Sequence, residues 1–246
     1  MLKQANPVPP GFKRLSIKGR EVFAPDDFVR ELHNHFLNEV PLVRWENQLH
    51  TIGRHIDSGN RFFLKVDIAS AFDSVRHREL STAVYKDWGW DTYIPDEYFF
   101  HKSGGLIQGA PASPYLFRLY CERSGLDTEL AAYCSEQNKL NNKGYVWSRY
   151  VDDVIISARN PIGRTVVPRL RSILRKRGFI LNDSKTIKRD TKWRPFEALG
   201  VRIYNGHVGP TTSFLGCLTD DGGGASIKGK RVWLKQVNQL NYKLED

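Results

Sequence analysis

Cysteine is scarce in this sequence, which has three cysteines among 246 residues. Cys121, Cys134 and Cys217 lie far apart and show no paired spacing, so the chain has neither the pattern of a disulfide framework nor that of a zinc site. We therefore expect ordinary buried thiols in a protein of a reducing compartment.

Long apolar runs are also missing. The first ten residues contain Pro7, Pro9 and Pro10 and no apolar core of signal-peptide length. No stretch approaches the roughly 20 apolar residues of a membrane-spanning helix. These absences predict a cytoplasmic protein with no membrane partner.

Acidic residues are outnumbered by basic ones. The chain has 37 Lys and Arg residues against 27 Asp and Glu residues, and its net charge is +10 at pH 7. A positive field of this kind favours a polyanionic partner and predicts strongly salt-dependent binding. On charge alone, a basic protein without such a partner is an equal alternative. The length allows one large domain or two small ones with a sizeable hydrophobic interior.

The tetrapeptide Tyr150–Asp153 places two adjacent carboxylates, Asp152 and Asp153, between segments typical of buried strands. The flanking segments Tyr145–Trp147 and Val154–Ile156 are rich in β-branched and aromatic residues, which predicts a β-hairpin with the acids at its tip. Burying ionised carboxylates without a partner is costly, so this arrangement favours a bound cation. Mg²⁺ suits it, because this ion takes oxygen ligands from carboxylates, water and phosphates.

A third carboxylate, Asp67, ends the apolar segment that begins at Arg61, and small residues and Phe72 follow it. This segment is predicted to be a strand. Because Asp67 and Asp152 are far apart in sequence, the fold must bring the strand end and the hairpin tip together before these acids can share a metal ion.

The two acidic segments resemble motifs A and C of reverse transcriptases. Five ordered matches over residues 61–203 are specific, whereas a lone Asp-Asp pair would be weak. The resemblance implies an α+β right-hand polymerase, with fingers, a palm whose antiparallel sheet is backed by helices, and a minimal C-terminal thumb. The three further matches are Gly105–Pro114 for motif B, Gly178–Thr186 for motif D and Ala198–Val201 for motif E.

The resemblance also implies a division of the chain into domains. Residues 1–62, with part of 78–107, would form the fingers, residues 63–205 the palm with motifs A to E, and residues 206–246 a short thumb or linker. Few residues follow motif E, so the thumb is expected to be short, incomplete or supplied by a noncoding RNA or a partner protein.

Two-metal nucleotidyl transfer is the chemistry that the resemblance implies. Two ions about 3.5–4 Å apart activate the 3′-hydroxyl, stabilise the pentavalent phosphate and neutralise the leaving pyrophosphate. By resemblance Asp67 and Asp152 bridge two Mg²⁺ ions, for which Mn²⁺ is an alternative. Ile68 joins the metal site, and Asp153 tunes it or holds metal and primer less directly. For Asp153 an ordinary surface carboxylate stays an open alternative.

Phe72 lies five residues after Asp67, where reverse transcriptases place an aromatic ring beneath the sugar. A bulky ring there excludes a 2′-hydroxyl and favours dNTPs, and the neighbouring Ala71 is assigned to nucleotide binding with it. RNA-synthesising polymerases of the same palm fold usually carry a second acid at that offset, and Asp73 lies at the wrong one. The alternative for Phe72 is a core aromatic after a strand.

Motifs B and D supply further candidates by resemblance. Gln108 can hydrogen-bond through both ends of its amide and Gly109 permits close backbone approach, so this loop is expected to position the nascent base pair and the template. Lys185 occupies the position where a lysine approaches the leaving pyrophosphate as general acid. As an isolated lysine on a basic surface, it would carry no such meaning.

The remaining nucleotide-binding candidates lie in two hairpins. Tyr150 is expected near the primer terminus and Val151 near the sugar, although either residue could simply pack within its hairpin. Residues 13–23 read as a basic hairpin of the fingers, where Lys18 and Arg20 would hold the incoming triphosphate. For Lys18 a solvated turn is a nearly equal alternative.

Helices are predicted from periodicity and capping residues. His33-Asn34-His35 spells a nuclease-like string, but the two histidines would point to different helix faces, so a surface helix is expected there. The polar stretch 136–144 is expected to be a loop and residues 220–224 a turn or linker. The expected helices start at Asp26 or Asp27, at residue 78, at Ser113 as N-cap, at residue 166 and at residue 227.

The sequence as a whole predicts an RNA-directed DNA polymerase that binds an RNA template, a DNA or RNA primer and dNTPs. The compact length and the Gln-Gly-Ala-Pro-x-Ser-Pro string most resemble prokaryotic enzymes of the retron, group II intron and phage-defence type. Two alternatives are kept. One is an RNA-synthesising polymerase of the same fold, and the other is a dependent or inactive nucleic-acid-binding subunit of a ribonucleoprotein.

Overall fold

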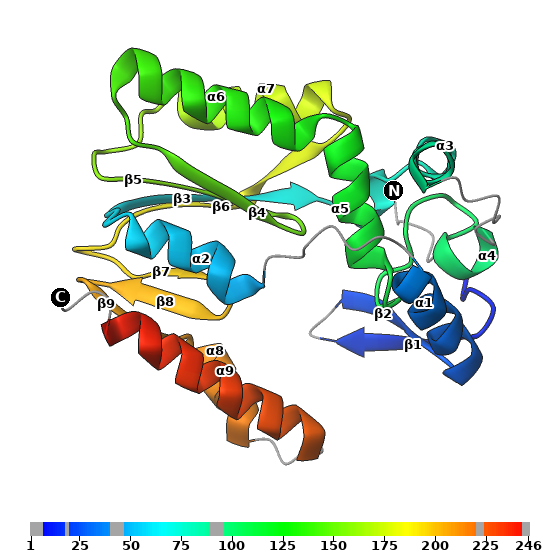
Figure 1. The fold of residues 1–246 in the computed structure, drawn as a ribbon. Coiled ribbons are helices and arrows are strands. Elements are labelled where there is room, and N and C mark those ends of the chain that lie inside the picture. The colour runs from blue at the N-terminus through cyan, green and yellow to red at the C-terminus, as the bar shows by residue number, and fades with distance from the viewer. Residues whose placement is uncertain (1–6, 18–19, 40–46, 89–95, 220–223, 243–246) are drawn as a thin grey trace. The chain divides into compact units, whose positions relative to one another are not determined.

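The computed structural model describes residues 7–17, 20–39, 47–88, 96–219 and 224–242 (Figure 1). The chain divides into two compact units, each assembled from segments that are distant in sequence. The first unit combines Met1–Trp45, Ala69–Thr128 and Ile173–Ile180, and the second combines Glu46–Ile68, Glu129–Ser172 and Leu181–Asp246.

The first unit begins with the predicted hairpin, in which β1 (Phe12–Ile17) pairs antiparallel with β2 (Arg20–Pro25). Helix α1 (Asp27–Glu39) follows, and Asp26 caps it, because its Oδ1 accepts a hydrogen bond of 2.9 Å from the backbone N–H of Val29. The structure thus identifies Asp26, and not Asp27, as the capping residue. The hairpin and helix share a small core with the loop that carries motif B.

The other helices of the first unit surround motif B. They are α3 (His77–Trp88), α4 (Asp96–Phe99) and α5 (Ser113–Arg123), and a single 3-10 turn covers Phe72–Ser74. The predicted helix at residue 78 is confirmed. The predicted N-cap role of Ser113 is wrong, because its buried hydroxyl donates to the carbonyl of Ile107 at 2.7 Å and Ala112 occupies the N-cap position.

The second unit is built on a four-stranded sheet in the order β4-β5-β3-β6. The predicted strand and the predicted acidic hairpin are both confirmed, since β3 and β4 each pair antiparallel with β5. Figure 1 shows α6 and α7 on one face of this sheet and α2 on the other. The bounds are β3 (Phe62–Ala69), β4 (Val146–Tyr150), β5 (Asp153–Ala158), β6 (Ile180–Asp190), α2 (Gln48–Asp57), α6 (Leu126–Asn141) and α7 (Val166–Lys176).

Helix α7 confirms the helix expected from residue 166, but α6 corrects the expected loop at 136–144. The helix continues to Asn141, because polar residues of this stretch cover its exposed side. Asn138 then fixes the exit of the chain: its Oδ1 accepts from the N–H of Tyr145 at 2.6 Å and its Nδ2 donates to the Tyr145 carbonyl at 2.9 Å.

A second sheet and two helices complete the second unit. The sheet has the order β7-β8-β9, and its apolar side chains join those of α2 in one core with Phe63 and Ile155. The expected terminal helix is confirmed, and residues 220–223 of the expected turn lie outside the described residues. These elements are β7 (Phe196–Ala198), β8 (Val201–Tyr204), β9 (His207–Pro210), α8 (Thr212–Thr219) and α9 (Gly224–Tyr242).

Two of the three cysteines can be compared with their prediction. The side chains of Cys121 and Cys134 are buried, as expected, and burial raises the pKa of Cys134 to about 12. The side chain of Cys217 lies outside the described residues. Among the helices described, none is both long enough and apolar enough to cross a bilayer.

Candidate active site

The three acids of motifs A and C meet at one end of the four-stranded sheet. Asp67 near the end of β3 is the register partner of Asp153 at the start of β5, and the N–H of Ile68 donates to the carbonyl of Asp152 at 3.0 Å. Register partners on adjacent antiparallel strands point their side chains to the same face. The fold therefore brings the strand end and the hairpin tip together within the second unit.

The hairpin turn contains a residue in an unusual backbone conformation. Val151 has a φ of 53°, and left-handed backbone is rare for a β-branched side chain and costs on the order of 1–3 kcal/mol. Arg149 supports the turn by donating from Nη1 to the Val151 carbonyl at 2.9 Å. Such strain is typical of functional sites, and residue type alone does not reveal it.

Asp67 is buried, with 6% of its surface exposed, and β6 supplies partners for both of its oxygens. Lys185 donates from Nζ to Oδ1 at 2.9 Å, and Asn182 donates from Nδ2 to Oδ2 at 3.0 Å. Sequence reasoning assigned Lys185 to the pyrophosphate and missed its bond to Asp67. It did not single out Asn182, although Asn182 belongs to the same motif D.

Asp153 has a different environment. The pKa of its carboxyl is raised to about 6, chiefly by burial and also by the charges of Asp152 and Asp67, while the charges of Lys65 and Lys185 act in the opposite direction. The Nζ of Lys65 lies 3.7 Å from its Oδ1. The site thus concentrates negative charge at a place that excludes much of the solvent.

The donor set of this site fits Mg²⁺, although it does not form a complete protein cage. Over the ranges that the structure describes, no group of three or more His, Cys, Asp or Glu side chains is arranged to hold a metal ion. Mg²⁺ usually takes only one or two carboxylates and completes its octahedron with water and substrate phosphates. Asp67 and Asp152 can supply those carboxylates, and the Lys185 ammonium already makes a cation contact with Asp67.

The motif B candidates lie in the first unit. The carbonyl of Gln108 accepts a hydrogen bond of 2.8 Å from the N–H of Phe23 on β2. Gly109 has a φ of 108°, and a Cβ placed there would lie 2.5 Å from the carbonyl oxygen of Phe23. Gly109 is therefore needed for the docking of its own loop against β2, whereas its expected approach to a nucleotide stays a prediction.

His33 holds the far side of this loop. Its Nε2 lies 3.0 Å from the Tyr98 carbonyl, and its Nδ1 accepts from the N–H of Ala112 at 3.3 Å, which requires a neutral ring with the proton on Nε2. Burial lowers the pKa of His33, consistent with that state. His33 is buried and His35 is exposed, so the two histidines lie on different faces of α1, as the helix geometry predicted.

The remaining candidates are distributed over both units. Ala71 and Phe72 lie in the first unit, where Phe72 is half-buried and packs edge-to-face on Phe117 with ring centroids 5.7 Å apart. Tyr150 lies in the second unit as the register partner of Asp153. Arg20 opens β2, but its side chain lies outside the described residues, as does Lys18 altogether.

A comparison with protein families gives one match that spans most of these elements. The family described as "Reverse transcriptase (RNA-dependent DNA polymerase)" matches residues 26–203, well over half of the chain. This chain belongs to the reverse transcriptase family. The match includes all five motifs, from Asp67 in motif A to Val201 in motif E. No curated protein sequence matches the chain.

Solved structures with a similar fold include apo telomerase from Candida tropicalis. That chain is 12% identical with a TM-score of 0.54, and the match covers 98% of this chain and 54% of the telomerase. At this identity the likeness concerns the fold alone. This reverse transcriptase family member therefore has the expected α+β architecture with antiparallel sheets, and it spans about half the length of the telomerase chain.

Two weaker matches carry no further argument. The Candida tropicalis telomerase truncated from its C-terminal domain is 14% identical, with a TM-score of 0.47 and coverage of 84% and 56% of the two chains. The foamy viral protease-reverse transcriptase in complex with double-stranded DNA is 18% identical, with a TM-score of 0.46 and coverage of 89% and 34%.

Proposed function

We propose that this chain is an RNA-directed DNA polymerase, which transfers nucleotides from dNTPs to a primer 3′-hydroxyl with two Mg²⁺ ions, or Mn²⁺ in their place. The observation that carries the proposal is the pairing of Asp67 with Asp153 beside Asp152, at the end of a largely buried sheet. The ordered set of five motifs around these acids supports it.

In this proposal Asp67 and Asp152 hold the metal ions, together with Ile68 and, less directly, Asp153. The bound ions would activate the attacking 3′-oxygen and stabilise the charge on the transferred phosphate. The 3′-hydroxyl would lose its proton to water, its oxygen would form a bond to the α-phosphorus, and the bond from that phosphorus to the leaving pyrophosphate would break. Lys185 carries a proton at Nζ beside Asp67, and it would pass that proton to the leaving pyrophosphate.

The choice of dNTPs over ribonucleotides is proposed from Phe72. Its half-buried ring packs on Phe117 within the first unit, and this packing fixes the position of the ring. A ring held beneath the sugar would exclude a 2′-hydroxyl. We assign Ala71, Gln108 and Gly109 of the first unit, and Tyr150 and Val151 of the second, to nucleotide binding, with Lys18 and Arg20 assigned to the triphosphate.

The proposed partners are an RNA template, a DNA or RNA primer and dNTPs. A noncoding RNA or a partner protein that contributes to the thumb is a further proposed partner. The compact set of motifs also supports a prokaryotic origin of the retron, group II intron or phage-defence type.

Primer extension on matched RNA and DNA templates tests the proposal. The purified protein with Mg²⁺ is expected to incorporate dNTPs on the RNA template, and Phe72→Ala is expected to increase ribonucleotide incorporation. A wild-type preference for ribonucleotides would instead indicate an RNA-synthesising polymerase. Salt-sensitive nucleic-acid binding without incorporation on either template would indicate a dependent or inactive subunit.

A further inference from the structure

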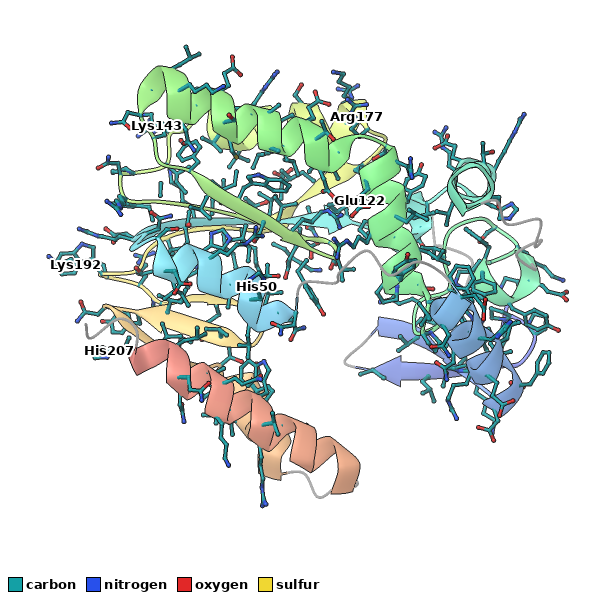
Figure 2. All side chains as sticks on the ribbon, viewed as in Figure 1. His50, Glu122, Lys143, Arg177, Lys192 and His207 are labelled. Carbon is teal, nitrogen blue, oxygen red and sulfur yellow. The ribbon has the colours of Figure 1, made fainter. Side chains whose placement is uncertain are left out.

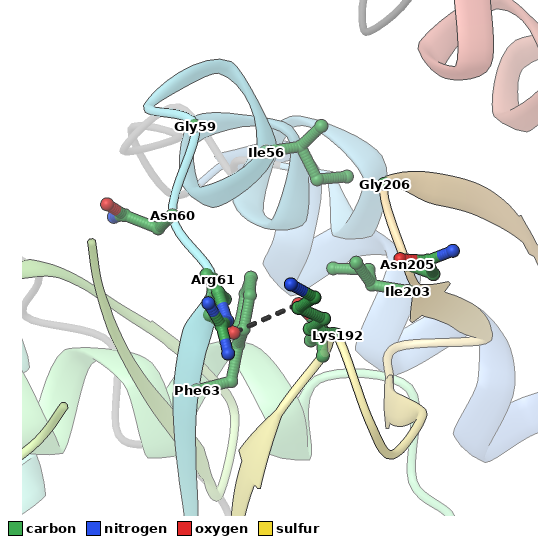
Figure 3. A pocket seen from close by; sticks show the side chains of 10 residues that line it. Ile56, Gly59, Asn60, Arg61, Phe63, Lys192, Ile203, Asn205 and Gly206 are labelled. Carbon is green, nitrogen blue, oxygen red and sulfur yellow. Dashed lines mark hydrogen bonds between the residues drawn. The ribbon is translucent and has the colours of Figure 1, made fainter. Parts of the chain in front are cut away.

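A cavity of about 370 Å³ lies in the second unit at the opposite end of β3 from the acids (Figure 3). Arg61, which lines it, precedes Asp67 by six residues, which corresponds to roughly 20 Å along a strand. The cavity is therefore separate from the catalytic acids. The apolar side chains of its lining are those of Ile56, Phe63 and Ile203. The polar side chains are those of Asn60, Arg61, Thr191, Lys192 and Asn205.

The turn beside this cavity, Asp190–Arg194, is rigidly held. Arg61 donates from Nε and Nη2 to the two oxygens of Asp190, both at 2.6 Å, and the N–H of Lys192 donates to Asp190 Oδ1 at 3.1 Å. Thr191 donates from its N–H and its hydroxyl to the Arg61 carbonyl at 3.0 and 2.9 Å. The N–H of Asn205 bonds to the Thr191 carbonyl at 2.7 Å, which ties the β8–β9 hairpin to the turn.

This rigid turn presents a large aromatic side chain to solvent. Trp193 is 68% exposed, and the Lys192 ammonium lies 5.1 Å from the centre of its ring. A fixed turn limits the conformational entropy that a ligand must remove when it stacks on the ring. Exposed aromatic rings beside positive charge are the platforms on which single-stranded nucleic acids stack their bases.

Positive charge surrounds the platform. Arg159 bonds from Nε to the carbonyl of Ser58 at 3.2 Å, next to the cavity-lining Gly59, and Arg194 lies in the turn itself. Arg61 offsets the charge of Asp190. Two further acids lie near this rim in sequence: Asp57 at the end of α2, and Glu197, whose Oε1 lies 3.8 Å from the Nε of Arg202. Figure 2 shows Lys192 projecting from this end of the second unit.

We propose that the Asp190–Arg194 turn and the adjacent cavity form an accessory binding site for single-stranded nucleic acid. A base stacks on Trp193, the backbone phosphates contact Lys192 and Arg159, and a neighbouring base enters the cavity against Ile56. The cavity volume is at the small end of the range for ligand pockets and suits one base. Asn205 offers its amide to the edge of that base. This site goes beyond the proposed polymerase activity.

Fluorescence anisotropy of short labelled oligouridine and oligodeoxythymidine tests the proposal, with an excess of unlabelled primer-template duplex to occupy the proposed polymerase site. Trp193→Ala is expected to weaken binding of one or both oligonucleotides about tenfold, and Trp193→Phe is expected to retain most of the affinity. Asn205 has a φ of 48°, a conformation that glycine also adopts. Asn205→Gly therefore removes only the side-chain amide, and a smaller loss of oligonucleotide affinity is expected. Leu140→Ala, at a site 71% exposed on α6, is the matched control and should change nothing.

An abasic oligonucleotide of equal length separates stacking from charge. Trp193→Ala is expected to leave the weak binding of the abasic oligonucleotide unchanged. Lys192→Glu is expected to weaken the binding of both the abasic and the base-containing oligonucleotides. Crosslinking of thiouridine-containing RNA is expected to map to the peptide that contains Trp193. Unchanged oligouridine and oligodeoxythymidine affinity in Trp193→Ala, an equal loss with the abasic ligand, or crosslinks that map only elsewhere would overturn the proposal.

Primer extension distinguishes this site from the catalytic one. Trp193→Ala should leave incorporation on a short primer-template unchanged, and Asp152→Asn should abolish incorporation while retaining oligonucleotide binding at the accessory site. A failure of polymerase activity in the wild type would thus leave the accessory-site test intact.

Discussion

At the scale of single residues, Asp153 combines burial with a candidate role in metal binding. Burial raises its pKa to about 6, whereas its ordinary value is 3.8. Above pH 6 the folded protein therefore holds a charge that unfolding releases to water, and this lowers stability. As the pH falls below 6 the folded state takes up the proton first, so the penalty shrinks, and it disappears once the pH is below the ordinary value of 3.8 and both states are protonated.

Asp153→Asn removes this penalty. In metal-free buffer at about pH 8, we expect the variant to raise the free energy of unfolding by about 1–3 kcal/mol, and at about pH 4 we expect only a small part of that gain. Urea denaturation at the two pH values measures the difference. A variant that is less stable than wild type at the higher pH would show that the carboxylate is well stabilised by Lys65 instead.

His55 changes stability with pH in the opposite direction. Its ring bonds to the hydroxyls of Ser157 at 2.7 Å and Ser148 at 2.8 Å, and burial, with the nearby Arg54 charge, lowers its pKa to about 3. The folded state keeps His55 neutral while the unfolded chain takes up a proton below pH 6.5. Its contribution to stability is complete above pH 6.5 and is lost as the pH falls toward 3.

His55→Gln is expected to flatten this dependence. Between about pH 6 and pH 4 the loss attributable to His55 is at most about 1.4 kcal/mol per pH unit. Asp153 changes the free energy of unfolding in the opposite direction over the same pH interval. The proteins with and without His55→Gln are therefore compared in the Asp153→Asn background. At neutral pH the Gln variant should be less stable by about 1–3 kcal/mol, since it replaces the histidine's bonds imperfectly. An equally steep pH profile in both proteins would exclude His55 as the cause.

At the scale of elements, the docking of the motif B loop on β2 depends on a glycine. Gly109→Ala would place a Cβ 2.5 Å from the Phe23 carbonyl oxygen, so we expect a loss of about 2 kcal/mol in stability and reduced nucleotide incorporation. Gly104→Ala is the matched control, because Gly104 also has a positive φ but has no atom within 4 Å of the added Cβ. Thermal unfolding and primer extension should separate the two variants, and equal losses would mean that the backbone conformation alone matters.

Elements with a strong local pattern could be predicted from the sequence. The strand ending at Asp67 and the hairpin at Asp152 carry β-branched and aromatic residues, and their pairing follows from the motif order. The helix over residues 136–141 was missed, because polar helix formers on an exposed face resemble a loop. The buried Ser113 hydroxyl bonds to a loop carbonyl rather than to its own helix, a tertiary choice that local capping rules cannot anticipate.

The hydrogen-bond partners of the acids could not be predicted from the sequence either. Lys185 was found through its motif, but its bond to Asp67 joins residues 118 positions apart and depends on where β6 lies. The contacts of His33 also depend on the tertiary fold, because they join α1 to Tyr98 and Ala112. Helix α2 carried no prediction, although Leu49, Ile52 and Ile56 have the spacing of one buried helical face.

At the scale of the whole molecule, the compact units are discontinuous in sequence. Strand β3 belongs with the hairpin that it pairs with, so the acids, Lys185 and Tyr150 all lie in the second unit. Phe72, Gln108 and Gly109 lie in the first. The proposed division into fingers, palm and thumb concerns function, and it stays a prediction beside this division by compactness.

The central claim is that Asp67 and Asp152 form the metal-dependent catalytic centre. The most direct measurement is RNA-templated dNTP incorporation with Mg²⁺ by wild type, Asp67→Asn and Asp152→Asn, with Asp73→Asn as the neighbouring control outside the proposed site. We expect both site variants to lose activity by at least about a thousandfold while retaining the fold and template binding, and the control to stay active. Undiminished incorporation by either site variant would contradict the account.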